Sequence, residues 1–190
     1  MDTNKRRLLL KDGFGDNDIA SIAWDLDWSL RKAIKGSSTV SKEVIYDTNL
    51  NKTFCHYLAD NYVELKYVIL YGPDLEVALE ELSAYPYFYT LADVTTFLEA
   101  FSSSSDDDYQ SDLILKSGII SGFGYEPAVD ELFKQAIATQ KEGLQLDVVI
   151  AIAYSSLKAY QAHVDYLVAA GCSQEVKDSA QHLLNGAHLE

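Results

Sequence analysis

Basic residues, cysteines and prolines are scarce in this 190-residue sequence. Fifteen Lys and Arg residues stand against 29 Asp and Glu residues, so the formal net charge is −14. This charge disfavours nucleic acid as a partner, because it would have to be overcome before any phosphate was contacted. The two cysteines, Cys55 and Cys172, are far apart and form no CxxC motif. We therefore expect a reduced, cytoplasmic protein.

Long apolar runs are also missing. The basic Lys5-Arg6-Arg7 is followed by only three leucines, whereas a secretory signal needs about 7–15 apolar residues. No convincing uncharged apolar run reaches the roughly 18 residues of a membrane span. We expect no signal peptide and no membrane partner. The final pair, Leu189-Glu190, is interpreted as a cloning remnant.

What the chain does contain is enough apolar mass for a folded core. Apolar residues make up 48% of the sequence and aromatic residues 12%, which excludes a disordered chain. The first helix is predicted over residues 16–35, because apolar residues recur there at spacings of three and four. Trp24 and Trp28 would share one face of this helix, either packed on a sheet or exposed to a partner.

Residues 43–71 change to the pattern of a β-sheet. Three segments in this range are rich in β-branched and aromatic residues, and they are separated by Asn49-Leu50-Asn51-Lys52 and by Asp60-Asn61, which suit tight turns. The pattern predicts a small three-stranded antiparallel meander. A sheet of this size needs a cover, which the helix over 16–35 or the helix after the last strand would supply.

From about residue 90 onward the pattern is helical and repeats. Val94, Val129 and Val164 begin similar segments at intervals of 35 residues. A second helix follows the first two copies at Asp112 and Asp147, again 35 residues apart. We expect about three helix pairs, each burying its apolar face on its neighbour as in an α-solenoid. The alternative is an ordinary helical bundle whose period is coincidental.

With paired helices at this spacing, the C-terminal half resembles HEAT-like helical repeats. The second helices open with an acidic residue and a small or aliphatic run, as in Asp147-Val148-Val149-Ile150-Ala151. The resemblance implies a HEAT-like α-solenoid over residues 89–188, after an N-terminal α+β subdomain over residues 1–88. The expected fold class is α+β, mostly α: an N-terminal helix, the three-stranded meander, and then the solenoid.

Residues that would specify a reaction are missing. No metal-ligand motif includes any of the four histidines, His56, His163, His182 and His188. We expect no catalytic residue, no cofactor and no metal. Calcium binding by the aspartates at 106–108 is an alternative, although the alternating ligands and the glycine of an EF-hand are absent. A further alternative is an unrecognised enzyme whose polar groups converge only in the fold.

The strongest functional signal is an acidic, tyrosine-rich segment. The 49 residues between Lys66 and Lys116 contain ten acids, six tyrosines and no Lys, Arg or His. Uncompensated carboxylates steer cationic partners, and tyrosine is favoured at interface hot spots. Residues 102–109 are predicted to form a flexible acidic loop between two helices. The predicted partner contacts are Asp106, Asp107, Asp108 and Tyr109, followed by Tyr85, Tyr87 and Tyr89.

A compact α/β start, which includes Thr53-Phe54-Cys55-His56-Tyr57 and Tyr67-Val68-Ile69-Leu70-Tyr71-Gly72, leads into helices in a small, acidic chain. In these respects the chain is similar to bacterial immunity proteins of polymorphic or contact-dependent toxin systems. The resemblance implies a non-catalytic protein that binds and neutralises a basic toxin, often a nuclease. The alternative is a HEAT-like scaffold or adaptor with a non-toxin protein partner.

Overall fold

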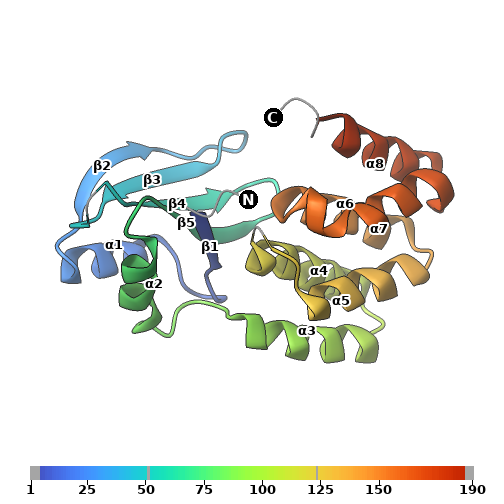
Figure 1. Ribbon diagram of the computed structural model, residues 1–190, viewed down its shortest axis with the longest axis horizontal. Coiled ribbons are helices and arrows are strands. Elements are labelled where there is room, and N and C mark those ends of the chain that lie inside the picture. Colours follow the sequence, from blue (N-terminus) through green and yellow to red (C-terminus); the bar gives the residue numbers. More distant parts are fainter. Residues whose placement is uncertain (1–4, 51, 123, 187–190) are drawn as a thin grey trace. The chain divides into compact units, whose positions relative to one another are not determined.

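The chain forms two compact units, Met1–Thr90 and Leu91–Glu190, and the computed structural model describes residues 5–50, 52–122 and 124–186 (Figure 1). The predicted cloning remnant at 189–190 lies outside the described residues. The first unit carries ten basic and 14 acidic residues, and the second carries five and 15. Their formal charges are therefore −4 and −10, so most of the net negative charge belongs to the second unit.

The first unit is built on a five-stranded antiparallel sheet with the strand order β1-β5-β4-β3-β2. The strands are β1 (Lys5–Leu9), β2 (Ser29–Ile34), β3 (Lys42–Asp47), β4 (Phe54–Asp60) and β5 (Leu65–Tyr71). The predicted three-stranded sheet is therefore wrong. Its segments correspond to β3, β4 and β5, and one further strand pairs at each edge. Because β1 pairs with a strand some 60 residues later, no local pattern indicates that it belongs to the sheet.

The predicted helix over residues 16–35 is wrong in its second half. Helix α1 (Asp16–Asp25) ends where Asp27 takes a left-handed backbone conformation, with φ of 55°. The chain then enters β2, where pairing with β3 provides the backbone hydrogen bonds that a longer helix would have made. Trp24 and Trp28 consequently do not share a helical face: Trp28 is buried in the core, whereas Trp24 is 84% exposed.

One face of the sheet carries the core of the first unit. Helices α1 and α2 (Leu75–Ser83) pack there, with Ile19 and Ala78 among the buried contacts. Side chains alternate along β4, so Cys55 and Tyr57 point into this core while Phe54 and His56 occupy the other face. Burial raises the pKa of Cys55 to about 12, which keeps this thiol protonated and unreactive at neutral pH.

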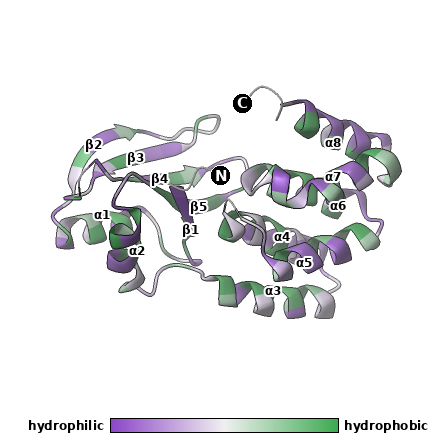
Figure 2. Ribbon diagram, in the orientation of Figure 1, coloured by the Kyte–Doolittle hydropathy of each residue, from purple (hydrophilic) through white to green (hydrophobic). Residues whose placement is uncertain are grey.

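The second unit consists of helices in two layers. Each helix packs against the next and against the next but one, so α3, α5 and α7 form one layer and α4, α6 and α8 the other. Figure 2 shows both apolar and polar residues along these helices. Buried residues of α5 recur at spacings of three and four (Val129, Leu132, Phe133 and Ala136), as expected for a helix with one buried side, whereas Ser117 to Ser121 of α4 are all buried. The resemblance to HEAT repeats stays a prediction. The helices are α3 (Leu91–Ser103), α4 (Asp107–Ser121), α5 (Pro127–Ala138), α6 (Glu142–Tyr154), α7 (Leu157–Ala170) and α8 (Gln174–Gly186).

Two buried glutamines 35 residues apart make similar contacts in successive helix pairs. The Gln110 side-chain amide donates to the carbonyl of Phe101 at the end of α3, at 3.0 Å. Thirty-five residues later, the Gln145 amide donates to the carbonyl of Ile137 at the end of α5, at 2.9 Å. Each glutamine therefore adds a side-chain hydrogen bond to a carbonyl in the last turn of the preceding helix, which also accepts a backbone N–H, from Ser104 in the first case and from Gln140 in the second.

Candidate protein-binding surface

The acidic residues at 106–108 begin helix α4 instead of forming a flexible loop. Asp106 is the N-cap, and its carboxylate accepts hydrogen bonds from the backbone N–H groups of Asp108 and Tyr109, both at 3.1 Å. Asp107 and Asp108 lie in the first turn, where carboxylates interact favourably with the positive end of the helix dipole. The predicted loop over residues 102–109 is therefore too long: α3 extends to Ser103, α4 begins at Asp107 after its Asp106 cap, and residues 104–106 alone connect the two helices.

The connections α3–α4, α5–α6 and α7–α8 meet at one end of the second unit (Figure 1). The Lys141 ammonium, just before α6, forms an ion pair with Asp107 of α4 at 2.6 Å. The Gln145 side-chain oxygen accepts a hydrogen bond from the backbone N–H of Cys172, between α7 and α8, at 2.9 Å. We call the surface formed by residues 104–109, 139–142 and 171–175 the acidic edge.

The acidic edge is exposed, and few cations balance its carboxylates. Lys141 is its one cation, and this residue is already paired with Asp107. Tyr109 is 46% exposed beside the acidic turn. Repulsion among the carboxylates is offset by the N-terminal ends of three helices, α4, α6 and α8, which point to this edge. The exposed acids of the edge are Asp106, Asp107, Asp108, Glu142 and Glu175.

Elsewhere in the second unit, lysines form ion pairs with aspartates of the same helix. Lys116 pairs with Asp112 at 2.8 Å, and Lys134 pairs with Asp130 at 2.6 Å, each one helical turn away. Of the five lysines in this unit, three are thus neutralised by neighbouring carboxylates. The negative field of the unit therefore arises from many acids that have no cation beside them.

The three predicted tyrosine contacts lie in the first unit, in the segment that follows α2. Tyr85 and Tyr87 are half-buried against the core cluster, and the Tyr87 ring stacks on Phe14 with centroids 4.5 Å apart. The Tyr89 hydroxyl donates a hydrogen bond to Asp12 at 3.2 Å. These contacts favour a packing role for all three. Their part in partner binding stays a prediction.

An aspartate–histidine pair in the second unit was not foreseen from the sequence. His163 Nε2 of α7 lies 2.7 Å from Asp130 Oδ1 of α5, and the rings of Phe133 and Tyr160 pack against the imidazole. Burial by itself raises the pKa of Asp130, but hydrogen bonds from Lys134 and His163 outweigh it and hold this pKa below its ordinary value. The pair thus links α5 to α7, with aromatic rings packed against the imidazole.

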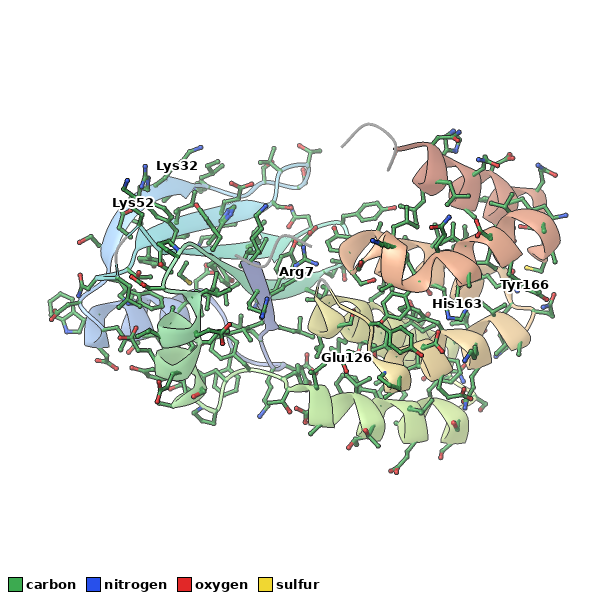
Figure 3. All side chains as sticks on the ribbon, viewed as in Figure 1. Arg7, Lys32, Lys52, Glu126, His163 and Tyr166 are labelled. Atoms are coloured by element: carbon green, nitrogen blue, oxygen red, sulfur yellow. The ribbon has the colours of Figure 1, made fainter. Side chains whose placement is uncertain are left out.

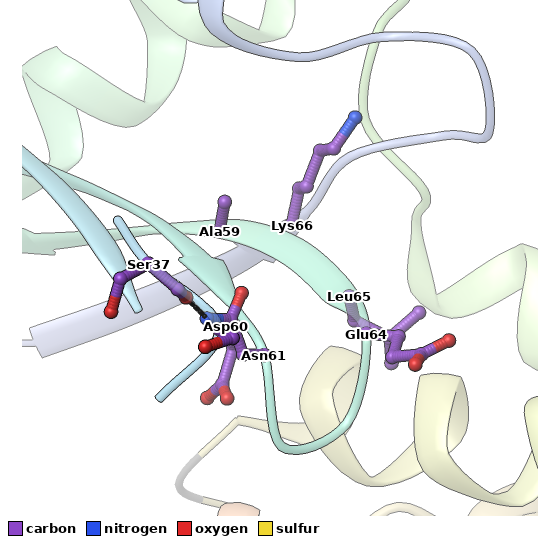
Figure 4. A pocket seen from close by; sticks show the side chains of 8 residues that line it. Ser37, Ala59, Asp60, Asn61, Glu64, Leu65 and Lys66 are labelled. Atoms are coloured by element: carbon purple, nitrogen blue, oxygen red, sulfur yellow. Dashed lines mark hydrogen bonds between the residues drawn. The ribbon is translucent and has the colours of Figure 1, made fainter. Parts of the chain in front are cut away.

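A hollow of about 350 Å³ lies in the first unit, beside the turn between β4 and β5 (Figure 4). Its polar groups are largely engaged in structural contacts. The Asn61 amide donates to the carbonyls of Ser37 at 2.5 Å and Val40 at 3.0 Å. The carboxylate of buried Asp60 accepts from the Tyr67 hydroxyl at 2.9 Å. These side chains hold the turn between β4 and β5 against the β2–β3 connection.

Within the part of the chain that the structure describes, no three His, Cys, Asp or Glu side chains are grouped so that they could hold a metal ion. None of the helices described has the length and apolar character needed to cross a membrane. No protein-family model, curated protein or solved structure matches the chain. The resemblances to HEAT repeats and to immunity proteins therefore stay predictions.

Proposed function

We propose that this chain is a non-catalytic, cytoplasmic binding protein whose acidic edge docks a basic protein, and that it acts as an immunity protein against a basic bacterial toxin. The observation that carries the proposal is the exposed acidic edge, where three helix N-termini gather five carboxylates around a single, already paired lysine. Carboxylates held in this way would occupy the positions at which a nuclease binds phosphates.

The proposal accounts for the charge difference between the units. With a formal charge of −10, the second unit attracts a basic protein from beyond contact distance and speeds its association. Tyr109, which is half-exposed next to the aspartates, adds an aromatic group of the kind that dominates interface energetics. The acidic edge also rests on helix ends, so docking requires no ordering of a loop.

A scaffold or adaptor is the second candidate, and the two-layered stack of α3–α8 favours it. Stacked helix pairs create extended surfaces that bind other proteins. A scaffold that bound through apolar contacts would be nearly indifferent to salt, whereas the acidic edge would lose affinity steeply as salt rises.

The test is capture of partners from the native host by the tagged chain at about 0.1 M and about 1 M salt, where the screening length falls from about 10 to about 3 Å. We expect one basic protein that is retained at low salt and largely lost at high salt. Expressed alone, this protein should stop growth, and co-expression of the chain should restore growth. A neutral partner retained at both salt concentrations would instead support the scaffold.

A matched pair of variants locates the surface. The first carries Asp107→Asn, Asp108→Asn, Glu142→Gln and Glu175→Gln, which neutralise the acidic edge but keep the Asp106 cap. The control carries Asp25→Asn, Asp27→Asn, Glu64→Gln and Glu80→Gln, which remove the same charge from exposed positions of the first unit. Only the first variant should lose the partner and the rescue of growth. Equal loss in both would show that net charge acts without this surface.

A further inference from the structure

The two outer edges of the sheet differ in how they are covered. Beside β1, the backbone N–H of Lys11 bonds to the carbonyl of Tyr87 at 2.8 Å, and that of Tyr89 bonds to the carbonyl of Leu9 at 2.9 Å. The other edge strand, β2, pairs with β3 on one side and, among the described residues, with no strand on the other. Five of its six residues are exposed. Backbone donors and acceptors along this edge are therefore open to another strand.

The two faces of β2 have different chemistry. A bulge between Leu30 and Lys32 adds Arg31 to the strand, and the Arg31 guanidinium lies over the Phe54 ring, on the face away from the helices. Lys32 is opposite Ile45 on that same face. Leu30 and Ala33 point to the face that α1 and α2 cover. A strand laid along β2 would thus meet cations on one side and apolar groups on the other.

Lysines around β2 lack acidic partners. Arg31 is paired with Asp47 at 2.9 Å, but Lys32, Lys35 and Lys52 are exposed and form no ion pair within the described residues. Lys32 and Lys52 both point away from the sheet in Figure 3. Like charges of this kind oppose the pairing of β2 with the β2 of a second copy. They favour a strand that carries carboxylates.

Two large, exposed apolar side chains lie at the start of the same edge. Leu30 is 63% exposed and Trp24, near the end of α1, is 84% exposed. Residues 26–28 alone join the helix to the strand, so Trp24 is held near the beginning of β2. Large exposed side chains next to a free strand edge are what an added strand would cover.

We infer that the free edge of β2 binds an extended segment of a protein partner by β-augmentation, and that this segment alternates acidic and apolar side chains. The acidic side chains would face Arg31 and Lys32, and the apolar ones would face Leu30 and Trp24. The period of two in a strand sets this alternation. The inference concerns the first unit and does not rest on the function proposed for the acidic edge.

The probe is a dye-labelled peptide of about ten residues that alternates Glu and Val, long enough to follow one strand. A peptide of the same composition with Glu and Val in two blocks is its control. Anisotropy should show binding of the alternating peptide and much weaker binding of the block peptide. Hydrogen exchange should show new protection of backbone amides within Ser29–Ile34 and not in the helical unit.

Two substitutions test the two faces. Lys32→Glu and Leu30→Ser should each weaken binding of the alternating peptide about fivefold or more, whereas Lys158→Glu on α7, the same charge change in the other unit, should leave it unchanged. Failure of the alternating peptide to bind, equal affinity of K32E and K158E, or protection away from β2 would each overturn the inference.

Discussion

The two units differ in the range of the contacts that hold them. In the first unit, β1 near the start of the chain pairs with β5, and β2 reaches the sheet only through β3. In the second unit, each helix packs on helices that follow within two elements. Structure built from local contacts forms and propagates from neighbour to neighbour, whereas the sheet requires distant segments to meet in register. A destabilising substitution should therefore loosen only neighbouring helices in the second unit but the whole sheet in the first.

The units also differ in how charge is used. In the first unit, carboxylates lie beside cations, as in the ion pairs of Asp16 with Lys42 and of Asp47 with Arg31. In the second, acids outnumber bases three to one and gather at helix N-termini. The first unit uses charge mainly to join elements. The second keeps a negative field that is available to a partner.

The largest loss of stability is expected at the contact between Gly118 of α4 and Ala151 of α6. A Cβ at Gly118 would lie 2.6 Å from the carbonyl oxygen of Ala151, so Gly118→Ala must push the helices apart. We expect a loss of about 3 kcal/mol in the free energy of unfolding, measured by denaturant titration. Gly143→Ala is the control, because nothing lies within 4 Å of its added methyl group. A G118A protein as stable as G143A would contradict the tight packing of α4 on α6.

The next prediction compares equivalent positions of two helix pairs. Gln145→Leu leaves the N–H of Cys172 without its partner and removes one of the hydrogen bonds to the carbonyl of Ile137, which should cost about 2–3 kcal/mol. Gln110→Leu should cost a similar amount through the carbonyls of Phe101 and Ser104. Hydrogen exchange should rise first in α5–α8 for the former and in α3–α4 for the latter. Simultaneous loss of protection throughout the unit in both variants would refute the local nature of these contacts.

Asp130 is expected to make a pH-dependent contribution to the free energy of unfolding. Because its pKa in the folded protein lies below the ordinary 3.8, the folded state binds this proton less readily than the unfolded state does. The stabilisation is complete above that ordinary value and is lost as the pH falls through the lower folded value. Asp130→Asn should cost about 2 kcal/mol at neutral pH, and stability measurements below pH 4 should show a shallower slope than in the parent. Equal slopes would argue against the brace between α5 and α7.

The smallest loss of stability is expected for a substitution in the first unit. The Tyr57 hydroxyl donates to Asp16 Oδ1 at 2.5 Å, which ties the sheet to the start of α1. Tyr57→Phe should cost about 1 kcal/mol and raise hydrogen exchange across β3, β4 and β5 together, since a sheet loses register as a whole. Tyr62→Phe is the control, because Tyr62 is 73% exposed. If exchange rose only beside position 57, the contrast between the two units would fail.

Local patterns predicted some elements and missed others for identifiable reasons. The β-branched and aromatic residues over 43–71 indicate β3, β4 and β5, and a buried-and-open alternation is clearest in β4, where Cys55 and Tyr57 are buried between partly exposed neighbours. The segment 29–34 fits a helical spacing equally well, and only pairing with β3 makes it a strand. In the same way, serines and aspartates at 102–109 suggest a loop, although Asp106 is also a strong cap residue.

The acidic edge, too, could be predicted only in part from the sequence. The excess of acid between Lys66 and Lys116 is evident from composition alone. Glu142 and Glu175 lie near Asp106–Asp108 only because the helix pairs stack. The 35-residue spacing of Gln110 and Gln145 was a signal in the sequence for this stacking. The tyrosines at 85–89 are near the aspartates in sequence, but they belong to the other unit.

The sequence by itself determined the charge, the lack of a catalytic or metal motif, the helical period of the second unit and the central strands, because each follows from residue type and local spacing. The tertiary structure alone decided that Lys5–Leu9 and Ser29–Ile34 complete the sheet, that Trp24 is exposed while Trp28 is buried, and that His163 meets Asp130. Those outcomes depend on which distant segments bury their apolar faces together, and a free energy shared across the whole core sets that choice.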